Sequence, residues 1–347
     1  MTDSNRPHAP RLLRVAQFGV GPIGAASLRA ACEMPWAEVV GAIDNDPSKV
    51  GKGLDELIDE PRLAGKTVYE DFDALQAATG GCDLVLHTAG SRAAVTLEQL
   101  GPIVSAGTDV ASTCEELLFP HLRAEEEARR FDDLCRSSDA SVVGTGVNPG
   151  FAMDLLPVVL TAVSLRVDKI AATRVVDATT RRGPLQRKIG SGLTPDDFRE
   201  RFRRGEAGHA GFRESAALIG HAMGWAIDDI EETLDPVVAE RGIETPHVSV
   251  EPAMVRGLHQ RCTLRADGVT RVELDLTMAL GEQDPHDRIE LLGDPHLRVR
   301  FDGGIPGDEA TVAALLSAGR RLSACRPGLL MMTDLPAPTR RVDTTTS

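Results

Sequence analysis

The sequence predicts an α/β protein in which an N-terminal Rossmann domain, a doubly wound parallel sheet, precedes an α+β domain with an open, largely antiparallel sheet. Three observations support this fold class. Short apolar segments alternate with helical patterns over the first 147 residues, which is typical of parallel βαβ units. A glycine-rich turn follows the first apolar segment. Beyond it, longer and partly alternating segments favour an antiparallel sheet.

The chain divides by these patterns into four predicted parts. Residues 1–147 form the dinucleotide-binding domain, and residues 148–310 form the substrate and dimerisation domain. A helix within residues 311–335 returns to the first domain, and residues 336–347 form a disordered tail. The junction is expected in the segment GTGVNPG, at residues 144–150, which is too rich in glycine and proline for a strand or a helix.

The elements follow from the apolar periodicity. In the first domain, strands are predicted at 12–18, 38–43, 83–87, 109–112 and 141–143, and helices at 25–34, 93–106 and 121–137. In the second, strands are predicted at 170–177, 247–255, 260–266 and 270–280. Helices are predicted at 194–204, 211–225 and 310–322, the first of them capped by Thr194 with Pro195 in its first turn.

Composition excludes several classes of protein. The 38 basic and 52 acidic residues give a net charge of −14, which disfavours nucleic acid and anionic membranes as partners. Residues 1–11 contain no apolar segment of the kind found in signal peptides. The six cysteines are scattered and form no metal-ligand pattern. We therefore expect reduced thiols, no metal site and a cytoplasmic location.

The glycine turn has the spacing of a dinucleotide-binding motif, G-x-G-x-x-G. Gly19 permits the tight turn, Gly21 lets the backbone approach a pyrophosphate, and Gly24 lets helix and strand pack closely. Pro22 and Ile23 complete the turn at the helix N-terminus, where negative charge is favoured. The alternative is an ordinary glycine turn.

An acidic residue follows the second predicted strand. Asp44 lies twenty positions after Gly24, with Asn45 beside it, where a carboxylate would accept hydrogen bonds from the adenosine ribose. A carboxylate would repel a ribose 2′-phosphate, so Asp44 favours NAD over NADP. Lys49 and Lys52 are close enough in sequence to weaken that preference.

Further candidates lie where the next predicted strands end. Thr88, Ala89 and Gly90 follow one strand, and Ser112 ends the next, so all four are expected near the nicotinamide half of the cofactor. Glu115 and Glu116 come directly afterwards and could act as general acid or base. The alternative is helix capping, because Ser112 with Glu115, or Thr113 with Glu116, has capping-box spacing.

The second domain supplies candidate substrate residues. Asn148 could hydrogen-bond the substrate or the nicotinamide carboxamide, or simply be a turn residue before Pro149. His209 could line the pocket or be a loop residue, and Arg182, next to Arg181, could bind a carboxylate or be solvated. Aromatic residues are few, so an aliphatic wall is expected from residues 151–156, beginning with Phe151.

Several segments together resemble the 2,4-diaminopentanoate dehydrogenase and native amine dehydrogenase family, whose first domain resembles dihydrodipicolinate reductase. They are VAQFGVGPIG, DVASTCEELLFP, GTGVNPGFAMDLLP, DATTRRGPLQRKIGSGLTPDDF, GHAGFRES and GIPGDEATVAALLSAGRRL. The resemblance implies reversible NAD(P)-dependent reductive amination of a small ketone or aldehyde with ammonia. It also implies that one glutamate of the E-E pair orients the ammonia or amine. We assign this role to Glu115, with Glu116 as the alternative.

The same residues also fit two other functions. The chain could instead be a carbonyl or hydroxyl oxidoreductase that does not use ammonia, or a non-catalytic nucleotide-binding protein of the same fold. The retained E-E pair argues against the non-catalytic protein. A second domain with a long open sheet often packs sheet against sheet, so a homodimer is expected.

Overall fold

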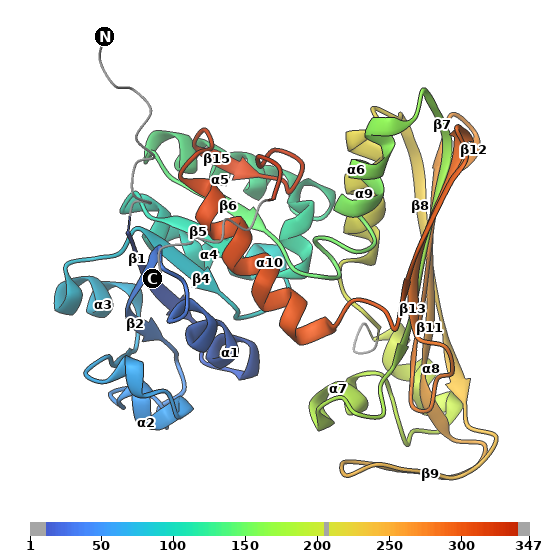
Figure 1. The fold of residues 1–347 in the computed structure, drawn as a ribbon, viewed down its shortest axis with the longest axis horizontal. Coiled ribbons are helices and arrows are strands. Elements are labelled where there is room, and N and C mark those ends of the chain that lie inside the picture. Colours follow the sequence, from blue (N-terminus) through green and yellow to red (C-terminus); the bar gives the residue numbers. More distant parts are fainter. Residues whose placement is uncertain (1–11, 205–207, 339–347) are drawn as a thin grey trace, which may run out of the picture. The chain divides into compact units, whose positions relative to one another are not determined.

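The computed structural model describes residues 12–204 and 208–338. Contacts within the chain define two compact units (Figure 1). The first contains the chain up to Gly146 and again from Asp308, and the second contains Val147–Gly307. The predicted disordered tail lies, from residue 339 onward, outside the described residues.

The first unit contains a sheet of seven parallel strands in the order β15-β6-β5-β4-β1-β2-β3. The strands are β1 (Leu13–Phe18), β2 (Ala37–Ile43), β3 (Val68–Tyr69), β4 (Leu84–His87), β5 (Asp109–Ser112), β6 (Ser141–Gly144) and β15 (Gly328–Leu330). Strand order reverses between β1 and β4, and ligands of such sheets bind at the carboxyl ends of the strands beside this point. The predicted Rossmann sheet is confirmed.

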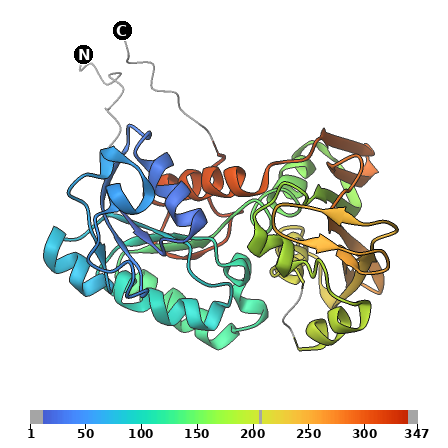
Figure 2. The same ribbon diagram turned by 90° about the horizontal axis from the view of Figure 1, so that it is seen from below.

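Helices cover both faces of this sheet (Figure 2). On one face lie α1 (Pro22–Ala31) and α10 (Gly307–Leu322); on the other lie α3 (Phe72–Thr79), α4 (Ala93–Ser105) and α5 (Glu125–Ser137). The short α2 (Leu54–Ile58) and the 3-10 turns η1 (Pro61–Leu63), η2 (Glu115–Leu118) and η3 (Pro120–Leu122) fill connections. Completely buried side chains such as Val85, Ile103 and Val110 form the core between sheet and helices.

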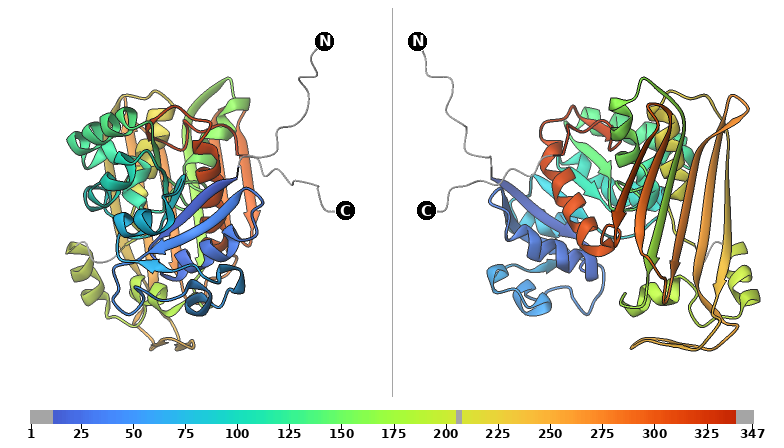
Figure 3. Two further views of the ribbon diagram at one scale, coloured as in Figure 1. Left: turned by 90° about the vertical axis from the view of Figure 1, so that its left-hand side faces the viewer. Right: turned by 45° about the vertical axis from the view of Figure 1, so that its right-hand side comes forward.

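The second unit is built on a six-stranded sheet in the order β14-β13-β7-β12-β11-β8 (Figure 3). All neighbours pair antiparallel except β7 and β12, which confirms the largely antiparallel sheet. The strands are β7 (Arg166–Asp177), β8 (Ile227–Val238), β11 (Val255–Ala266), β12 (Val269–Ala279), β13 (His286–Asp294) and β14 (Leu297–Asp302), with a separate hairpin of β9 (Ile243–Glu244) and β10 (Ser249–Val250).

Helices of the second unit gather on one face of its sheet. Figure 1 shows α6 (Leu155–Leu160) and α9 (Phe212–Ala222) against this face, α6 continuing into the turn η4 (Thr161–Val163). Two further helices, α7 (Gly183–Lys188) and α8 (Pro195–Arg203), follow β7 in the chain. On the opposite face, Arg261 and Arg265 of β11 are exposed. One sheet face is therefore apolar and covered, and the other is polar.

Several predicted elements are wrong in their bounds. Within the strand predicted at 247–255, only β10 at Ser249–Val250 is a strand, and a turn follows at Pro252, Ala253 and Met254, because Ala253 has a φ of 68° and Pro252 has no N–H to give a sheet. Strand β11 then starts at Val255, before the predicted residue 260. Helix α1 starts at Pro22, not at residue 25, since proline is favoured in the first helical turn. Helix α5 starts at Glu125, after the separate turn η3.

A buried ion pair ties β7 to β13. Nη1 of Arg174 contacts both carboxylate oxygens of Asp287, at 2.8 and 2.7 Å, and the two residues are only 4% and 2% exposed. The same groups hold Ile305, whose N–H donates to Asp287 and whose carbonyl accepts from Nη2 of Arg174. The pair therefore fixes the segment just before α10.

We predict that Asp287→Ala lowers the free energy of unfolding by about 3 to 5 kcal/mol, because it leaves the Arg174 guanidinium buried without its counter-ion. Urea denaturation followed by circular dichroism measures this. The matched control is Asp302→Ala, which removes an exposed carboxylate of β14 and should change stability by less than about 1 kcal/mol. Equal effects of the two substitutions would contradict the assigned role of the pair.

Candidate active site

The glycine loop joins β1 to α1 and depends on the absence of a side chain at Gly24. A Cβ atom there would lie 1.9 Å from the carbonyl oxygen of Gly19, so only glycine permits this packing. Gly19 itself has a φ of 87°, which favours glycine. A Cβ on Gly21 would meet nothing within 4 Å, and no described side chain caps α1. The loop therefore presents open backbone at a helix N-terminus, which fits a pyrophosphate.

Two polar side chains hold this loop in place. Nε2 of Gln17, a completely buried residue of β1, donates to the Gly19 carbonyl at 3.1 Å and to Oγ1 of Thr88 at 2.9 Å. Oγ1 of Thr88 also donates to the Gly19 carbonyl, at 2.9 Å. Sequence reasoning missed Gln17, although a polar residue in the middle of an apolar strand is the signal that could have identified it.

Asp44 follows β2 and is already engaged within the protein. Its Oδ2 accepts from the Val20 N–H and from Nζ of Lys49, both at 2.8 Å, and its Oδ1 accepts from the Asp46 N–H at 2.9 Å. Burial raises the pKa of Asp44, but these hydrogen bonds and the Lys49 charge outweigh it, so the pKa is lowered. Asn45 next to it is exposed. Because Lys49 compensates the carboxylate charge, Asp44 does not by itself decide between NAD and NADP.

The residues after β4 lie at the same sheet edge as the glycine loop. The Thr88 N–H donates to the Phe18 carbonyl, and Ala89 lies close to Gly19, where an added Cβ would be 3.2 Å from that of Ala89. Gly90 has a φ of 88°, which lets the chain turn away from the edge. Thr88, Ala89 and the glycine loop are thus brought together as the sequence predicts.

Ser112 at the end of β5 belongs to an internal hydrogen-bond network. Its hydroxyl accepts from the Cys114 N–H at 3.1 Å and lies 2.8 Å from Nδ1 of His87, and its carbonyl accepts from the Thr145 N–H. Burial lowers the pKa of His87 to about 4, so the ring is neutral at pH 7. Ser112 is completely buried and aligns the ends of β4, β5 and β6.

The two adjacent glutamates occupy different environments in the turn η2. The carboxylate of Glu116 accepts from the Ala93 N–H at 2.8 Å, at the N-terminus of α4, and lies 3.6 Å from Nε of Arg123. Glu116 thus stabilises the start of that helix. Glu115, the first residue of η2, is partly exposed and lies just beyond the carboxyl end of β5.

Neither capping box suggested by the sequence forms in the described chain. Cys114, and neither Ser112 nor Thr113, is the residue before η2, and its side chain makes no cap hydrogen bond. The Ser112 hydroxyl is engaged with His87 and Cys114, and Oγ1 of Thr113 donates to the His87 carbonyl at 3.5 Å. Capping of α4 explains Glu116.

Asn148 is the second residue of the second unit and is anchored through its backbone. Nε2 of His209 donates to the Asn148 carbonyl at 2.8 Å, and two residues later the Gly150 N–H donates to the buried carboxylate of Asp154 at 2.8 Å. The side-chain Nδ2 and Oδ1 of Asn148 are buried, and neither has a hydrogen-bond partner in the described chain. Such an amide is suited to binding a polar ligand.

The neighbours of Asn148 are held by an extended network. The Ser215 hydroxyl of α9 donates to Asp154 at 2.7 Å, and the His209 N–H donates to Oε1 of Gln260 at 2.7 Å. Burial lowers the pKa of His209 to about 4 and raises that of Asp154. The structure thus brings Asn148 and His209 together, and it adds Asp154, which sequence reasoning missed.

The remaining predicted residues lie elsewhere in the two units. Arg182 precedes α7, in a loop wrapped around Gln186, whose Nε2 donates to the carbonyls of Ala178, Thr179 and Arg181. Phe151 is partly buried in the turn before α6. Glu115 belongs to the first unit and Asn148 to the second.

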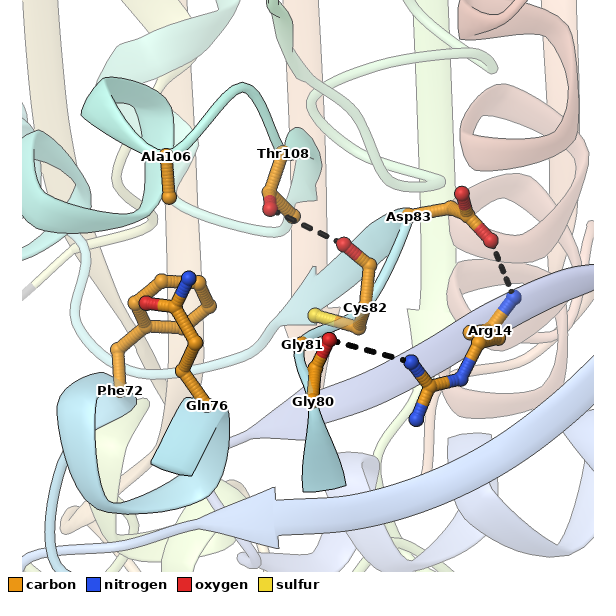
Figure 4. Close-up of a pocket in the computed structure, with 9 residues that line it drawn as sticks. All are labelled: Arg14, Phe72, Gln76, Gly80, Gly81, Cys82, Asp83, Ala106 and Thr108. Carbon is orange, nitrogen blue, oxygen red and sulfur yellow. Dashed lines mark hydrogen bonds between the residues drawn. The ribbon is translucent and has the colours of Figure 1, made fainter. Parts of the chain in front are cut away.

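A cavity of about 190 Å³ in the first unit lies at the opposite edge of the sheet, at the amino ends of β1, β4 and β5 (Figure 4). The Arg14 guanidinium in it donates to the carbonyls of Thr79 and Gly80, at the C-terminus of α3. This guanidinium therefore caps the C-terminus of α3, and the cavity is lined by none of the predicted site residues. In the described residues no cluster of His, Cys, Asp and Glu could hold a metal, and no helix is long and apolar enough to cross a membrane.

Comparison with known proteins identifies relatives over nearly the whole chain. Residues 151–346 match the family model described as the 2,4-diaminopentanoate dehydrogenase C-terminal domain. The 2,4-diaminopentanoate dehydrogenase of Acetoanaerobium sticklandii is 27% identical over 336 residues, covering 94% of each chain. An amine dehydrogenase of Streptomyces virginiae is 23% identical, covering 94% of this chain and 96% of its own.

A solved structure shares the fold. The amine dehydrogenase of Mycobacterium smegmatis matches with a TM-score of 0.84 at 20% identity, covering 96% of this chain and 98% of that one.

We predict that alanine at Gly24 affects stability, whereas alanine at Gly21 affects dinucleotide binding. Gly24→Ala should lower the melting temperature, because the new Cβ collides with the Gly19 carbonyl. Gly21→Ala should leave the melting temperature unchanged, because its Cβ points into open space, but should weaken dinucleotide binding about tenfold or more. Thermal denaturation and calorimetric titration measure the two effects, and normal binding by Gly21→Ala would contradict the placement of the pyrophosphate.

Proposed function

The chain belongs to the 2,4-diaminopentanoate dehydrogenase family, and from this premise we propose that it is an NAD(P)-dependent amine dehydrogenase. It reductively aminates a small ketone or aldehyde with ammonia, and in reverse it oxidatively deaminates an amine or diamino acid. One observation carries the proposal: Glu115 lies beyond the carboxyl end of β5, at the same edge of the parallel sheet as the glycine loop. A proton-transfer group and a dinucleotide cradle thus share one edge.

The cofactor would be held by the backbone of the glycine loop and by residues of neighbouring strand ends. Gly19 to Gly24, including Pro22 and Ile23, receive the pyrophosphate, and Asp44 with Asn45 faces the adenosine ribose. Thr88, Ala89, Gly90 and Ser112 position the nicotinamide half, and the side-chain amide of Asn148 suits the carboxamide. When bound, the cofactor supplies or accepts a hydride.

Glu115 performs the proton transfers in this proposal. Ammonia attacks a carbonyl only as neutral NH₃, so a carboxylate must take a proton from ammonium. The protonated Glu115 then returns this proton to the hydroxyl of the carbinolamine, which leaves as water, so that an iminium cation and an ionised Glu115 remain. An anionic side chain beside that cation lowers the barrier, because the charge develops as the iminium forms.

Substrate contacts are proposed for Phe151, His209 and Arg182. Phe151 contributes apolar surface and His209 a neutral ring, and the aromatic content of 3% leaves aliphatic side chains to form most of the wall. Arg182 would bind a carboxylate where the substrate is an amino acid. A small aliphatic carbonyl compound fits this chemistry.

We also propose a homodimer through the sheet of the second unit. Helices cover one face of that sheet, and the other face carries exposed side chains such as Arg261 and Glu273. Sheet-on-sheet packing of two copies would cover it. Light scattering should give twice the mass of one chain, whereas the mass of a single chain would exclude the dimer.

The reaction is tested by its requirement for ammonia. We expect the purified protein to oxidise NADH or NADPH with short ketones and aldehydes only when ammonium is present, and to reduce NAD or NADP with the corresponding amines. Absorbance of the reduced nicotinamide follows both directions. Turnover without ammonium would indicate a carbonyl oxidoreductase, and cofactor binding without turnover of amines, ketones or alcohols would indicate a non-catalytic protein.

The two glutamates should separate chemistry from stability. We predict that Glu115→Gln reduces amination at least about a hundredfold while cofactor affinity and melting temperature stay unchanged, because the amide cannot accept the proton. Glu116→Gln should instead lower stability by about 1 kcal/mol, through weaker stabilisation of α4. Steady-state kinetics and thermal denaturation measure these effects. Full activity in Glu115→Gln, with lost activity in Glu116→Gln, would transfer the role to Glu116.

A further inference from the structure

The surroundings of Asp44 differ from those expected of a site that binds only NAD. An ionised carboxylate has about four lone-pair positions for hydrogen bonds. The Asp44 carboxylate already accepts hydrogen bonds from three donors: the N–H groups of Val20 and Asp46, and Nζ of Lys49. An adenosine ribose without phosphate offers two hydroxyl donors. Asp44 can therefore accept both only if Lys49 withdraws.

Lys49 is held against Asp44 by a tight turn. The N–H groups of Lys49 and Val50 donate to the Asp46 carbonyl, and the Ser48 N–H donates to the Asp46 carboxylate. The chain thus returns so that Nζ of Lys49 lies 2.8 Å from Asp44 and 3.8 Å from Asp46. The Lys49 side chain is 25% exposed, compared with 9% for Asp44, so its ammonium group lies on the solvent side of the pair.

The positive charge of the Lys49 ammonium group favours binding of a ribose 2′-phosphate. Asp44 alone would repel it, but Lys49 neutralises Asp44 and keeps three N–H donors on a flexible stem. The same ammonium can turn from the carboxylate to a phosphate at the ribose 2′ position, or bridge the two. With an unphosphorylated ribose, it can withdraw into solvent and leave Asp44 to the hydroxyls.

We propose that Lys49 binds the 2′-phosphate of NADP, so that the site accepts both 2′-phosphorylated and unphosphorylated adenine dinucleotides. This inference rests on the proposed function, because it requires the dinucleotide to lie along the glycine loop. Lys49 is then the specificity-determining residue of the adenosine end of the site, and Asp44 serves both cofactors by fixing the loop through Val20 and by orienting Lys49.

The test uses two fragments, 2′,5′-ADP and ADP, in calorimetric titrations that do not depend on catalysis. The wild type should bind them with affinities within about tenfold of each other. Lys49→Gln should weaken 2′,5′-ADP about tenfold or more and change ADP less than about twofold, because one charge-assisted contact is lost. Lys49→Arg, which keeps the charge, should retain 2′,5′-ADP. Lys52→Gln removes an exposed charge three residues away and is the matched control, with affinities as in the wild type.

The outcomes separate this inference from the function on which it rests. Equal losses of both fragments in Lys49→Gln, or no loss of either, would overturn the role of Lys49 and leave the nucleotide site intact. The role of Lys49 would also be overturned if the wild type bound 2′,5′-ADP more than about a hundredfold more weakly than ADP. Failure of both fragments to bind the wild type would overturn the proposed function and this inference with it.

Discussion

The close approach of Gly24 to the Gly19 carbonyl is the constraint on which the nucleotide half of the protein depends. With no Cβ in the way, α1 can begin at Pro22 directly against the end of β1. Gln17 and Thr88 then fix the Gly19 carbonyl, and Asp44 fixes the Val20 N–H. The glycine loop is thus hydrogen-bonded to the residues that follow β2 and β4. At Gly21 its backbone borders open space.

The carboxyl ends of the short parallel strands place the candidate site residues of the first unit at one edge of the sheet. Ser112 joins the ends of β4, β5 and β6 through His87 and Thr145, so the turn carrying Glu115 starts from a rigid base. Glu116 turns toward α4 and stabilises its first turn. We propose the proton transfers for its neighbour, Glu115.

The sequence predicts the first unit better than the second, for a physical reason. The parallel strands are covered by helices on both faces, so they read as apolar runs, and Asp109–Ser112 was predicted with its observed bounds. Strand β8 has the sequence IDDIEETLDPVV with only Ile230 and Leu234 buried, so it carries no such signal. Strand β14 likewise exposes Arg298, Arg300 and Asp302. Both lie at sheet edges, where burial is smallest.

Some features of the candidate site can be predicted from the sequence, and others cannot. The glycine spacing and Asp44 are local signals, and the structure brings them together. The contacts of Asp44 with Lys49, of Glu116 with Ala93 and of Ser112 with His87 depend on how the chain folds back on itself, so spacing alone could not reveal them. Both capping boxes have the right spacing, but the residue before η2 is Cys114, so neither Ser112 nor Thr113 stands at the cap position.

Hydride transfer from a nicotinamide to an imine formed from ammonia leaves two isotopic marks on the product. A reaction with a ketone, ¹⁵N-ammonium and NADH deuterated at the transferable position of C4, analysed by mass spectrometry, detects both. We expect an amine that carries one deuterium on the former carbonyl carbon together with ¹⁵N. A deuterated alcohol without ¹⁵N would contradict it.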